Sequence, residues 1–179
     1  MQRRENIILI GFMGSGKSSI GKRVSKRLGF QFIDTDQIVI DRAGMPIADI
    51  FERLGEDKFR DLESSALRSI AHLNRCLVAT GGGIVVRSEN RALLRQLGYV
   101  ICLTASEDVI FERVSRNSKR PLLHTPNPRQ TLSALLTTRQ PFYGETAQFI
   151  LDTTKMPQAE AEDAIVDEAR RAFSWHRAA

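Results

Sequence analysis

Long apolar runs, cysteine and histidine are scarce in this chain of 179 residues, and each scarcity excludes a class of protein or site. No apolar run approaches the roughly 20 residues that a helix needs to cross a bilayer, which excludes a transmembrane protein. With 12 glycines, 42% hydrophobic and 26% charged residues, the chain is neither collagen-like nor disordered, and it lacks the periodicity of a coiled coil. The length predicts one globular domain, residues 1–179, around one core.

Cysteine occurs at Cys76 and Cys102, each inside an apolar run. Neither belongs to a Cys-x-x-Cys motif and no histidine is near either in the sequence, so we expect buried, reduced thiols, with a disulfide or a reactive thiol as the alternative. His72, His124 and His176 stand alone, which excludes a metal site built from histidine and cysteine.

The first residues superficially resemble a secretory signal peptide, because a basic start precedes the apolar run 7–10. That run ends at once in a glycine- and serine-rich segment, with no small-residue cleavage site after it. We therefore expect a cytoplasmic protein.

The formal net charge of +5 is concentrated in two blocks. Residues 1–30 and 113–139 each carry a net +6, whereas residues 31–112 and 140–179 carry −4 and −3. Nucleic acid, an anionic membrane and a small anion are all compatible with such blocks, and solvated helix faces are the simplest alternative. Lysine and arginine are not interleaved with aromatic residues and no helix presents a one-sided basic stripe, which disfavours nucleic acid.

Short apolar runs alternate with longer segments of helical periodicity. The runs predict strands at 7–10, 32–34, 76–79, 99–103 and 149–151. Most are apolar throughout, as expected for parallel strands covered on both faces. The pattern predicts an α/β fold: a five-stranded parallel sheet flanked by helices.

The helical segments carry start and stop signals. Ile20, Val24 and Leu28 form an i, i+4, i+8 stripe. Expected helix starts are Pro46, Ser88 and Ser106, and expected ends are Gly29, Gly55 and Gly98. The basic segment 117–130 contains several prolines and is predicted to be a long loop, and such loops are usually lids or disordered.

Residues 11–18, Gly-Phe-Met-Gly-Ser-Gly-Lys-Ser, match the Walker phosphate-binding motif at every position and lie between a predicted strand and a predicted helix. Glycines let backbone N–H groups turn toward phosphate oxygens, and the helix adds the positive end of its dipole. Lys17 brings a charge to the β- and γ-phosphates and the Ser18 hydroxyl can bind Mg²⁺. The motif predicts a nucleoside triphosphate site.

The residues that identify other classes of nucleotide-binding protein are missing or misplaced. A GTPase needs an Asn-Lys-x-Asp signature, which the sequence lacks. Residues 164–168, Ala-Ile-Val-Asp-Glu, resemble the apolar strand ending in Asp-Glu that is typical of a motor ATPase. Their surroundings, however, have helical periodicity. We expect a surface helix there.

Asp34 and Asp36 follow the second apolar run, at the edge of the sheet where α/β proteins bind ligands. In an extended strand both carboxylates would point the same way, one toward hydrated Mg²⁺ and the other toward an acceptor hydroxyl. The alternative for Asp36 is an N-cap for a helix that starts at Gln37.

Arg60 and Arg139 are candidate anion ligands. Glu63 is three residues beyond Arg60 on a helix, so it can hold the guanidinium, although a surface ion pair is the alternative. Arg139 continues the apolar face of Leu132 and Leu136, and an inward arginine needs an anionic partner. Gly81, Gly82 and Gly83 follow the third strand and would let backbone approach a ligand, although a flexible turn explains them equally well.

In order and spacing these motifs resemble the shikimate kinases, small P-loop kinases of the nucleoside-monophosphate kinase type. The resemblance covers about residues 5–157 and includes GFMGSGKS, FIDTD, IADIFERLGEDKFRDLE, TGGGIV, RPLL and RQPFY. It implies a three-layer P-loop kinase fold with a mobile lid at about 117–130. The implied reaction is ATP-dependent phosphorylation of the 3-hydroxyl of shikimate, with Mg²⁺, on the route to aromatic amino acids.

The resemblance also implies residue roles. Asp36 would hold the reacting hydroxyl and act as base, and Arg60 and Arg139 would grip the substrate carboxylate beside Gly81, Gly82 and Gly83. Lys17 and the lid residue Arg120 would act on the transferring phosphate, and Ser18 and Asp34 would organise Mg²⁺. The implied ATP contacts are Gly14, Ser15, Gly16, Lys17, Ser18, Ser19, Arg113, Arg120 and, near the base, Pro157. We expect a monomer that binds neither nucleic acid nor a membrane.

Two rival functions make different predictions. A kinase for another small acid, such as gluconate, shares the Walker loop and the acidic strand end, but is not expected to carry FRDLE, TGGG and RPLL together. A nucleotide-binding regulatory module would hydrolyse ATP slowly, with no dependence on an acceptor.

Overall fold

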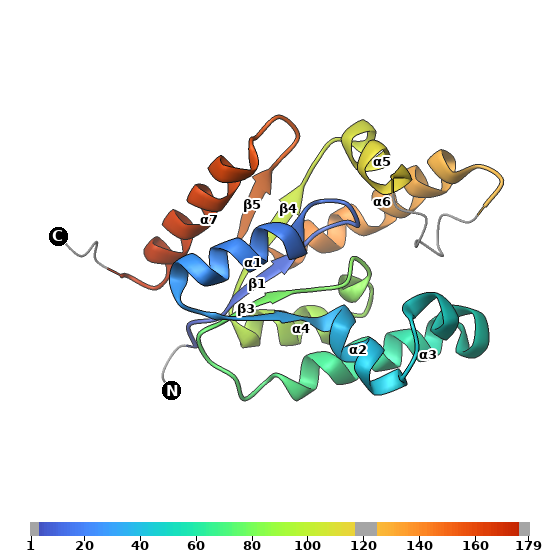
Figure 1. Ribbon diagram of the computed structural model, residues 1–179, viewed down its shortest axis with the longest axis horizontal. Helices are drawn as coiled ribbons and strands as arrows, with labels where there is room; N and C mark the ends of the chain where they lie inside the picture. The colour runs from blue at the N-terminus through green and yellow to red at the C-terminus, as the bar shows by residue number, and fades with distance from the viewer. Residues whose placement is uncertain (1–3, 117–124, 176–179) are drawn as a thin grey trace.

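A parallel five-stranded sheet with helices on both faces forms the protein (Figure 1). The computed structural model describes residues 4–116 and 125–175. The strands are β1 (Ile7–Ile10), β2 (Gln31–Asp34), β3 (Cys76–Ala79), β4 (Tyr99–Thr104) and β5 (Phe149–Asp152), in the order β2-β3-β1-β4-β5. The predicted strands are confirmed, with ends shifted by at most a residue, as is the predicted α/β fold class.

The helices are α1 (Lys17–Leu28), α2 (Thr35–Ala43), α3 (Ile47–Ser69), η1 (Ile84–Val86), α4 (Ser88–Leu97), α5 (Glu107–Ser115), α6 (Pro128–Thr146) and α7 (Gln158–Ala172). Helices α2 and α3 on one side and α5 and α6 on the other lie near the ends of the strands where the loop after β1 is found (Figure 1). No helix within residues 4–116 and 125–175 is both long and apolar enough to cross a membrane.

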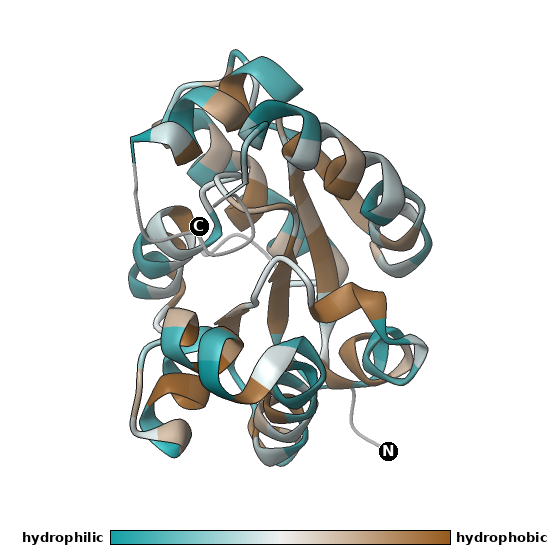
Figure 2. Ribbon diagram, turned by 90° about the vertical axis from the view of Figure 1, so that its right-hand side faces the viewer, coloured by the Kyte–Doolittle hydropathy of each residue, from teal (hydrophilic) through white to brown (hydrophobic). Residues whose placement is uncertain are grey.

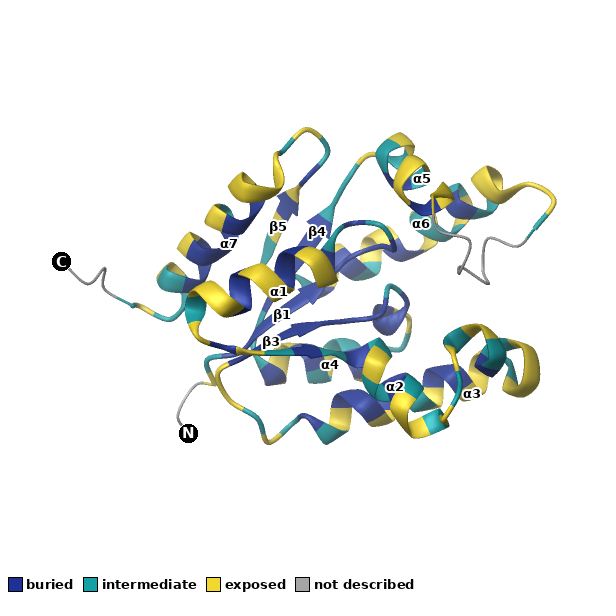
Figure 3. Ribbon diagram, in the orientation of Figure 1, coloured by how far each residue is buried: buried dark blue, intermediate teal, exposed yellow. Residues whose placement is uncertain are grey.

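Alternation along the strands divides the core between the two faces of the sheet. Ile7 and Leu9 pack with α1 and α7, whereas Ile8 and Ile10 pack with the helices of the opposite face. The central strands β1, β3 and β4 are consequently mostly hydrophobic in Figure 2 and mostly buried in Figure 3, whereas the edge strands β2 and β5 are partly exposed. Covering both faces explains why the central strands have no polar side. Cys76 and Cys102 are buried in these strands and free, which confirms the prediction of reduced thiols.

Several expected helix boundaries are confirmed. Gly29 ends α1 in the left-handed conformation, and the side chain of Ser106 caps α5. Gly55 interrupts α3 with φ 80 and ψ 168, so the two predicted helices form one element with a break.

Three expectations about helices were wrong. Ser88 is the first helical residue of α4 and does not cap it through its side chain. Helix α6 begins at Pro128, within the segment expected to be loop up to 130, because proline is well tolerated in a first helical turn. The helix predicted around 164–168 is α7, but Glu168 is buried on it and accepts a hydrogen bond from Tyr99, so this residue does not belong to a surface.

Candidate active site

The Walker loop joins β1 to α1 through glycines whose backbone other residues rarely adopt. Gly11, Gly14 and Gly16 have φ values of 139, 78 and 93. A side chain at Gly11 would also collide with the carbonyl oxygen of Leu103. The first turn of α1 contains no acidic residue, so nothing there opposes the positive end of its dipole. The loop therefore has the shape and the field of an anion site.

Lys17 is the first residue of α1 and its ammonium group lies inside the loop. Nζ donates hydrogen bonds to the carbonyl oxygens of Gly11 and Phe12, at 2.8 and 2.9 Å. The side chain is buried, so its charge acts in surroundings that screen it weakly. A phosphate in this loop would meet a fixed positive charge.

One cavity of about 220 Å³ connects the loop with the second and third strands. Its lining consists of Met13, Gly14, Gly16, Lys17, Ser18, Ser19, Asp36, Thr80 and Gly82. The phosphate-binding lysine and an acidic residue thus share one space.

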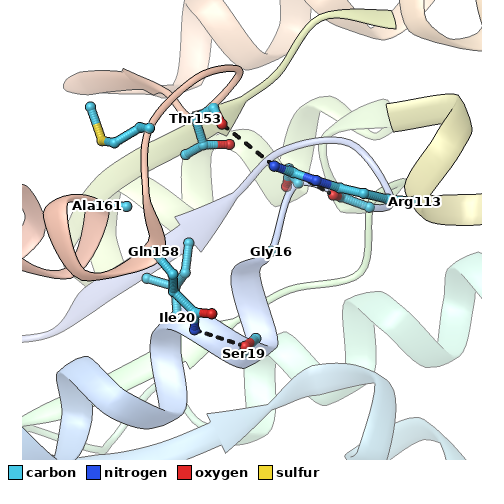
Figure 4. Close-up of a pocket in the computed structure, with 10 residues that line it drawn as sticks. Gly16, Ser19, Ile20, Arg113, Thr153, Gln158 and Ala161 are labelled. Carbon is cyan, nitrogen blue, oxygen red and sulfur yellow. Dashed lines mark hydrogen bonds between the residues drawn. The ribbon is translucent and has the colours of Figure 1, made fainter. Parts of the chain in front are cut away.

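A second cavity, also about 220 Å³, opens on the other side of the loop (Figure 4). Arg113 of α5 spans it, donating to the carbonyl oxygens of Gly14 at 3.2 Å and Thr153 at 3.4 Å. Gln158 donates to Ser19 Oγ at 3.0 Å across the same space. The placement of Arg113 beside the Walker loop suits contact with a nucleotide.

The wall of this second cavity contains residues that the sequence analysis missed. Thr153, Met156, Gln158 and Ala161 line it, and Pro157 caps α7 between two of them without lining the cavity. These four residues lie within four positions of Pro157 in the sequence, and this closeness was the signal that could have found them. The sequence offered no sign that β5 and α7 meet α1 at this point.

Asp34 and Asp36 do not lie on one extended strand, so that prediction was wrong. Strand β2 ends at Asp34 and α2 begins at Thr35. Asp34 Oδ1 accepts from the backbone N–H of Asp36 at 3.0 Å, which caps the helix and turns the chain. The alternative was also wrong, because the cap is Asp34 and Asp36 is in the first turn.

The turn sends the two carboxylates to different partners. Asp34 Oδ2 accepts a hydrogen bond from Ser18 Oγ at 2.8 Å, which joins β2 to the start of α1. Asp36 faces the glycine turn, since a side chain at Gly81 would lie 2.5 Å from Asp36 Oδ1. The adjacent oxygens of Ser18 and Asp34 suit Mg²⁺, which prefers oxygen ligands and usually takes one or two from protein.

Arg60 and Glu63 form a buried ion pair, and the alternative of a surface pair was wrong. Their exposed fractions are 5% and 1%, and Arg60 Nη1 lies 2.5 Å from Glu63 Oε2. Burial raises the pKa of Glu63 to about 7; Arg60 and Arg139 oppose this shift and the negative charge of Asp36 adds to it. The same four side chains therefore share one electrostatic environment.

Arg139 is buried on α6, as its helical position predicted, with an exposed fraction of 4%. Its guanidinium lies over the ring of Phe12, 5.7 Å from the ring centroid. Burial lowers the pKa of Arg139, and the positive charge of Arg60 lowers it further. The two buried guanidinium groups therefore repel each other, and an anion between them would relieve this repulsion.

Tyr143 was not predicted as a site residue, although it belongs to the RQPFY motif. It lies one helical turn after Arg139, is buried, and donates a hydrogen bond to the carbonyl oxygen of Gly82 at 2.5 Å. This hydrogen bond joins α6, which carries Arg139, to the glycine turn at residues 81–83.

The glycine triplet is packed against the site, so the alternative of a merely flexible turn was wrong. A side chain at Gly81 would lie 2.6 Å from Glu63 Oε1, and one at Gly83 would lie 2.6 Å from Cζ of Arg60. A side chain at Gly82 would lie 3.1 Å from the backbone nitrogen of Met13 in the Walker loop. At Gly81 and Gly83 only glycine fits without moving the charged groups.

Arg120 and residues 117–124 of the predicted lid lie outside the described residues. Of that segment the structure describes 125–130, which lead into α6.

Comparisons with known proteins agree on one family. The family model described as shikimate kinase matches residues 13–170. A shikimate kinase of Thermodesulfovibrio yellowstonii is 45% identical over 167 residues, 93% of this chain and 96% of the relative. One from Geobacter sulfurreducens is 47% identical over 148 residues, covering 83% and 81% of the two chains.

Solved structures agree. The shikimate kinase from Acinetobacter baumannii in complex with shikimate superimposes with a TM-score of 0.88 at 34% identity, covering 93% of each chain. A gluconokinase from Sinorhizobium meliloti reaches a TM-score of 0.58 at 24% identity, which shows a shared fold alone.

Proposed function

The chain belongs to the shikimate kinase family, and we propose that the Walker loop, Asp36 and the two buried arginines form its active site. The protein is an ATP-dependent phosphotransferase with an alcohol acceptor. It transfers the γ-phosphate of ATP to the 3-hydroxyl of shikimate, which gives shikimate 3-phosphate and ADP in aromatic amino acid biosynthesis.

The observation that carries the assignment of residues is the cavity that Lys17 and Asp36 line together. Phosphoryl transfer requires mainly that donor and acceptor be positioned in line and that the developing charge be stabilised. Lys17 marks the place of the donor phosphate, and Asp36 marks the place of the acceptor hydroxyl.

On the donor side, backbone N–H groups of Gly14, Ser15 and Gly16 and the N-terminus of α1 bind the phosphates. Ser18 and Asp34, which are joined by a hydrogen bond, would hold Mg²⁺, and Ser19 lines the first cavity beside Ser18. When bound, Mg²⁺ neutralises charge on the β- and γ-phosphates. The second cavity receives the nucleoside, with Arg113 against the base and the segment around Pro157 opposite.

On the acceptor side, Arg60 and Arg139 bind the carboxylate of shikimate, because planar guanidinium groups match a carboxylate in charge and shape. Gly81, Gly82 and Gly83 let the ring approach the backbone. Asp36 accepts the proton of the 3-hydroxyl as the oxygen attacks the γ-phosphate.

We propose that the lid implied at about 117–130, whose last residues 128–130 belong to α6, completes the site. Arg120 approaches the transferring phosphate from this lid, where an arginine contributes on the order of 10³-fold in rate. Closure excludes water, which otherwise competes as acceptor. The lid belongs to the same domain, residues 1–179.

The basic residues at the site are explained by the small anions that they bind. Lys17, Arg120 and Arg139 surround ATP and a carboxylated substrate. We propose that the protein works as a cytoplasmic monomer without a nucleic acid or membrane partner.

The acceptor dependence of ATP turnover tests the function. Purified protein with Mg-ATP is expected to release ADP rapidly only when shikimate is added. Equal turnover with gluconate would indicate a sister kinase, and slow turnover independent of any acceptor would indicate a regulatory module.

Asp36→Asn tests the proposed base. The variant should bind ATP normally and lose about 10²- to 10⁴-fold in kcat, the usual contribution of a positioned base. Asp41→Asn, an exposed position on the same helix, is the matched control. Near-normal turnover of Asp36→Asn would remove Asp36 from the mechanism.

A further inference from the structure

A second carboxylate occupies Arg60 from the side that faces away from Glu63. Glu56 Oε1 accepts hydrogen bonds from Arg60 Nε at 3.2 Å and from Nη2 at 2.7 Å. Nη1 is bound to Glu63, and a side chain at Gly83 would collide with the guanidinium group, most closely at Nη1. The Nε and Nη2 edge is therefore where another carboxylate would reach Arg60, and Glu56 occupies it.

Glu56 also acts on the second arginine of the site. Its negative charge, like that of Glu63, favours the charged form of Arg139 and opposes the effects of burial and of Arg60. The carboxylate thus lies within electrostatic reach of both guanidinium groups. A substrate carboxylate held by Arg60 and Arg139 would make the same two interactions.

The two glutamates that hold Arg60 differ in their freedom to leave. The side chain of Glu63 is 1% exposed, whereas that of Glu56 is 52% exposed. Glu56 follows Gly55, where α3 is interrupted. Glu63 is a fixed partner in the core, and Glu56 can turn into solvent at little cost in hydration.

We propose that Glu56 is a latch that holds the place of the substrate carboxylate on Arg60 and must be displaced when shikimate binds. The proposal rests on the proposed function, in which Arg60 binds that carboxylate. Glu56 is the second carboxylate on Arg60, beside the fixed partner Glu63, and occupies the edge that Glu63 does not. It also favours ligands that engage both arginines and the glycine turn, because a simple anion replaces the Glu56 contact without further gain.

Removal of the latch is expected to tighten binding of the substrate. Calorimetric titration of Glu56→Gln and Glu56→Ala should give shikimate dissociation constants about two- to fivefold lower than that of the unaltered protein, the range expected for a partly exposed ion pair. Alanine should have the larger effect, because glutamine retains an oxygen that accepts from Arg60. The KM for ATP should stay unchanged.

Two controls separate the latch from a general effect of charge. Asp49→Asn removes a carboxylate from the same helix that pairs with Arg53 and not with Arg60, and should leave shikimate affinity unchanged. The methyl ester of shikimate lacks the negative charge, so Glu56→Ala should not tighten it. An equal gain with Asp49→Asn, or with the ester, would overturn the latch.

Variants of Arg60 separate failure of the latch from failure of the proposed function. Arg60→Ala should lose most shikimate affinity, and adding Glu56→Ala to it should give no gain. If Arg60→Ala weakens binding and Glu56→Ala leaves it unchanged or weaker, the latch is wrong and the function stands. If Arg60→Ala binds shikimate normally, the proposed carboxylate site is itself wrong.

Discussion

The proposed donor and acceptor sides of the site differ in how they would bind anions. The centre of the donor side is eight consecutive residues, 11–18, in which main chain, one lysine and a helix N-terminus supply the positive potential. The acceptor side collects charged side chains from α2, α3 and α6 around a glycine turn, and Arg60, Glu63 and Arg139 are all buried.

This difference determines how each side depends on the rest of the protein. Backbone N–H groups are neutral, so they can point at a phosphate without the cost of burying charges. Buried arginines and glutamates are stable only as a set, because removing one partner leaves another charge without compensation. Changes on the donor side should therefore act locally, and changes on the acceptor side should spread through the set.

The largest separation of the two sides is expected for Lys17→Ala. This substitution removes the positive charge that would face the β- and γ-phosphates. It should lower kcat by about 10³-fold, the range for loss of one preorganised electrostatic group. The shikimate dissociation constant should change by less than about twofold, which is no more than an ordinary surface substitution causes. Lys26→Ala, on the exposed face of α1, serves as the control. A comparable loss of shikimate affinity in Lys17→Ala would show that the two sides are not separable.

Arg139→Ala should act on the acceptor side almost alone. Loss of a charge-assisted contact to a carboxylate is worth about 1.5–3 kcal/mol, so the KM for shikimate should rise by roughly 10- to 150-fold. Steady-state kinetics should show little change in the KM for ATP. Arg129→Ala, an exposed arginine on the same helix, is the control, and Arg139→Lys should restore only part of the affinity. An equal rise in both KM values would contradict the comparison.

Glu63→Gln tests whether the acceptor side is stabilised as a set. Burial raises the pKa of Glu63 from 4.5 to about 7, so over that pH range the folded protein retains a proton that the unfolded chain releases. The free energy of unfolding contributed by this group therefore falls as pH rises through that range, by on the order of 3 kcal/mol, and is level above it.

Urea denaturation across the same pH range measures this effect. The unaltered protein minus Glu63→Gln should give a difference that declines with rising pH, whereas Glu112→Gln, on an exposed ion pair, should give a flat one. A flat difference for Glu63→Gln would mean that this carboxyl titrates normally in the fold.

The smallest effect is expected at Arg113. Its hydrogen bonds go to main-chain oxygens of Gly14 and Thr153, so Arg113→Ala should raise the KM for ATP only about fivefold, as for the loss of roughly 1 kcal/mol. Shikimate binding should not change. Arg116→Ala, three residues further along the chain, is the control, and an unchanged KM for ATP would remove Arg113 from the nucleotide site.

The sequence alone determined the features that depend on neighbouring residues. The Walker loop could be predicted because its glycines, Lys17 and Ser18 lie in one eight-residue segment. The strand and helix on either side of it have clear patterns. The strands could be read because a sheet covered on both faces needs unbroken apolar runs. The buried position of Arg139 followed from its place on the apolar face of one helix.

Only the tertiary structure decided what depends on contacts between distant segments. The cap formed by Asp34 placed Asp36 in a helix and against Gly81, because one side-chain hydrogen bond outweighed continuation of the strand. Burial turned Arg60 and Glu63 from a plausible surface pair into a coupled set with Arg139. Spacing along a chain records which side chains share a helix face, but the cost of a charge depends on what packs over it, and that is set by the rest of the fold.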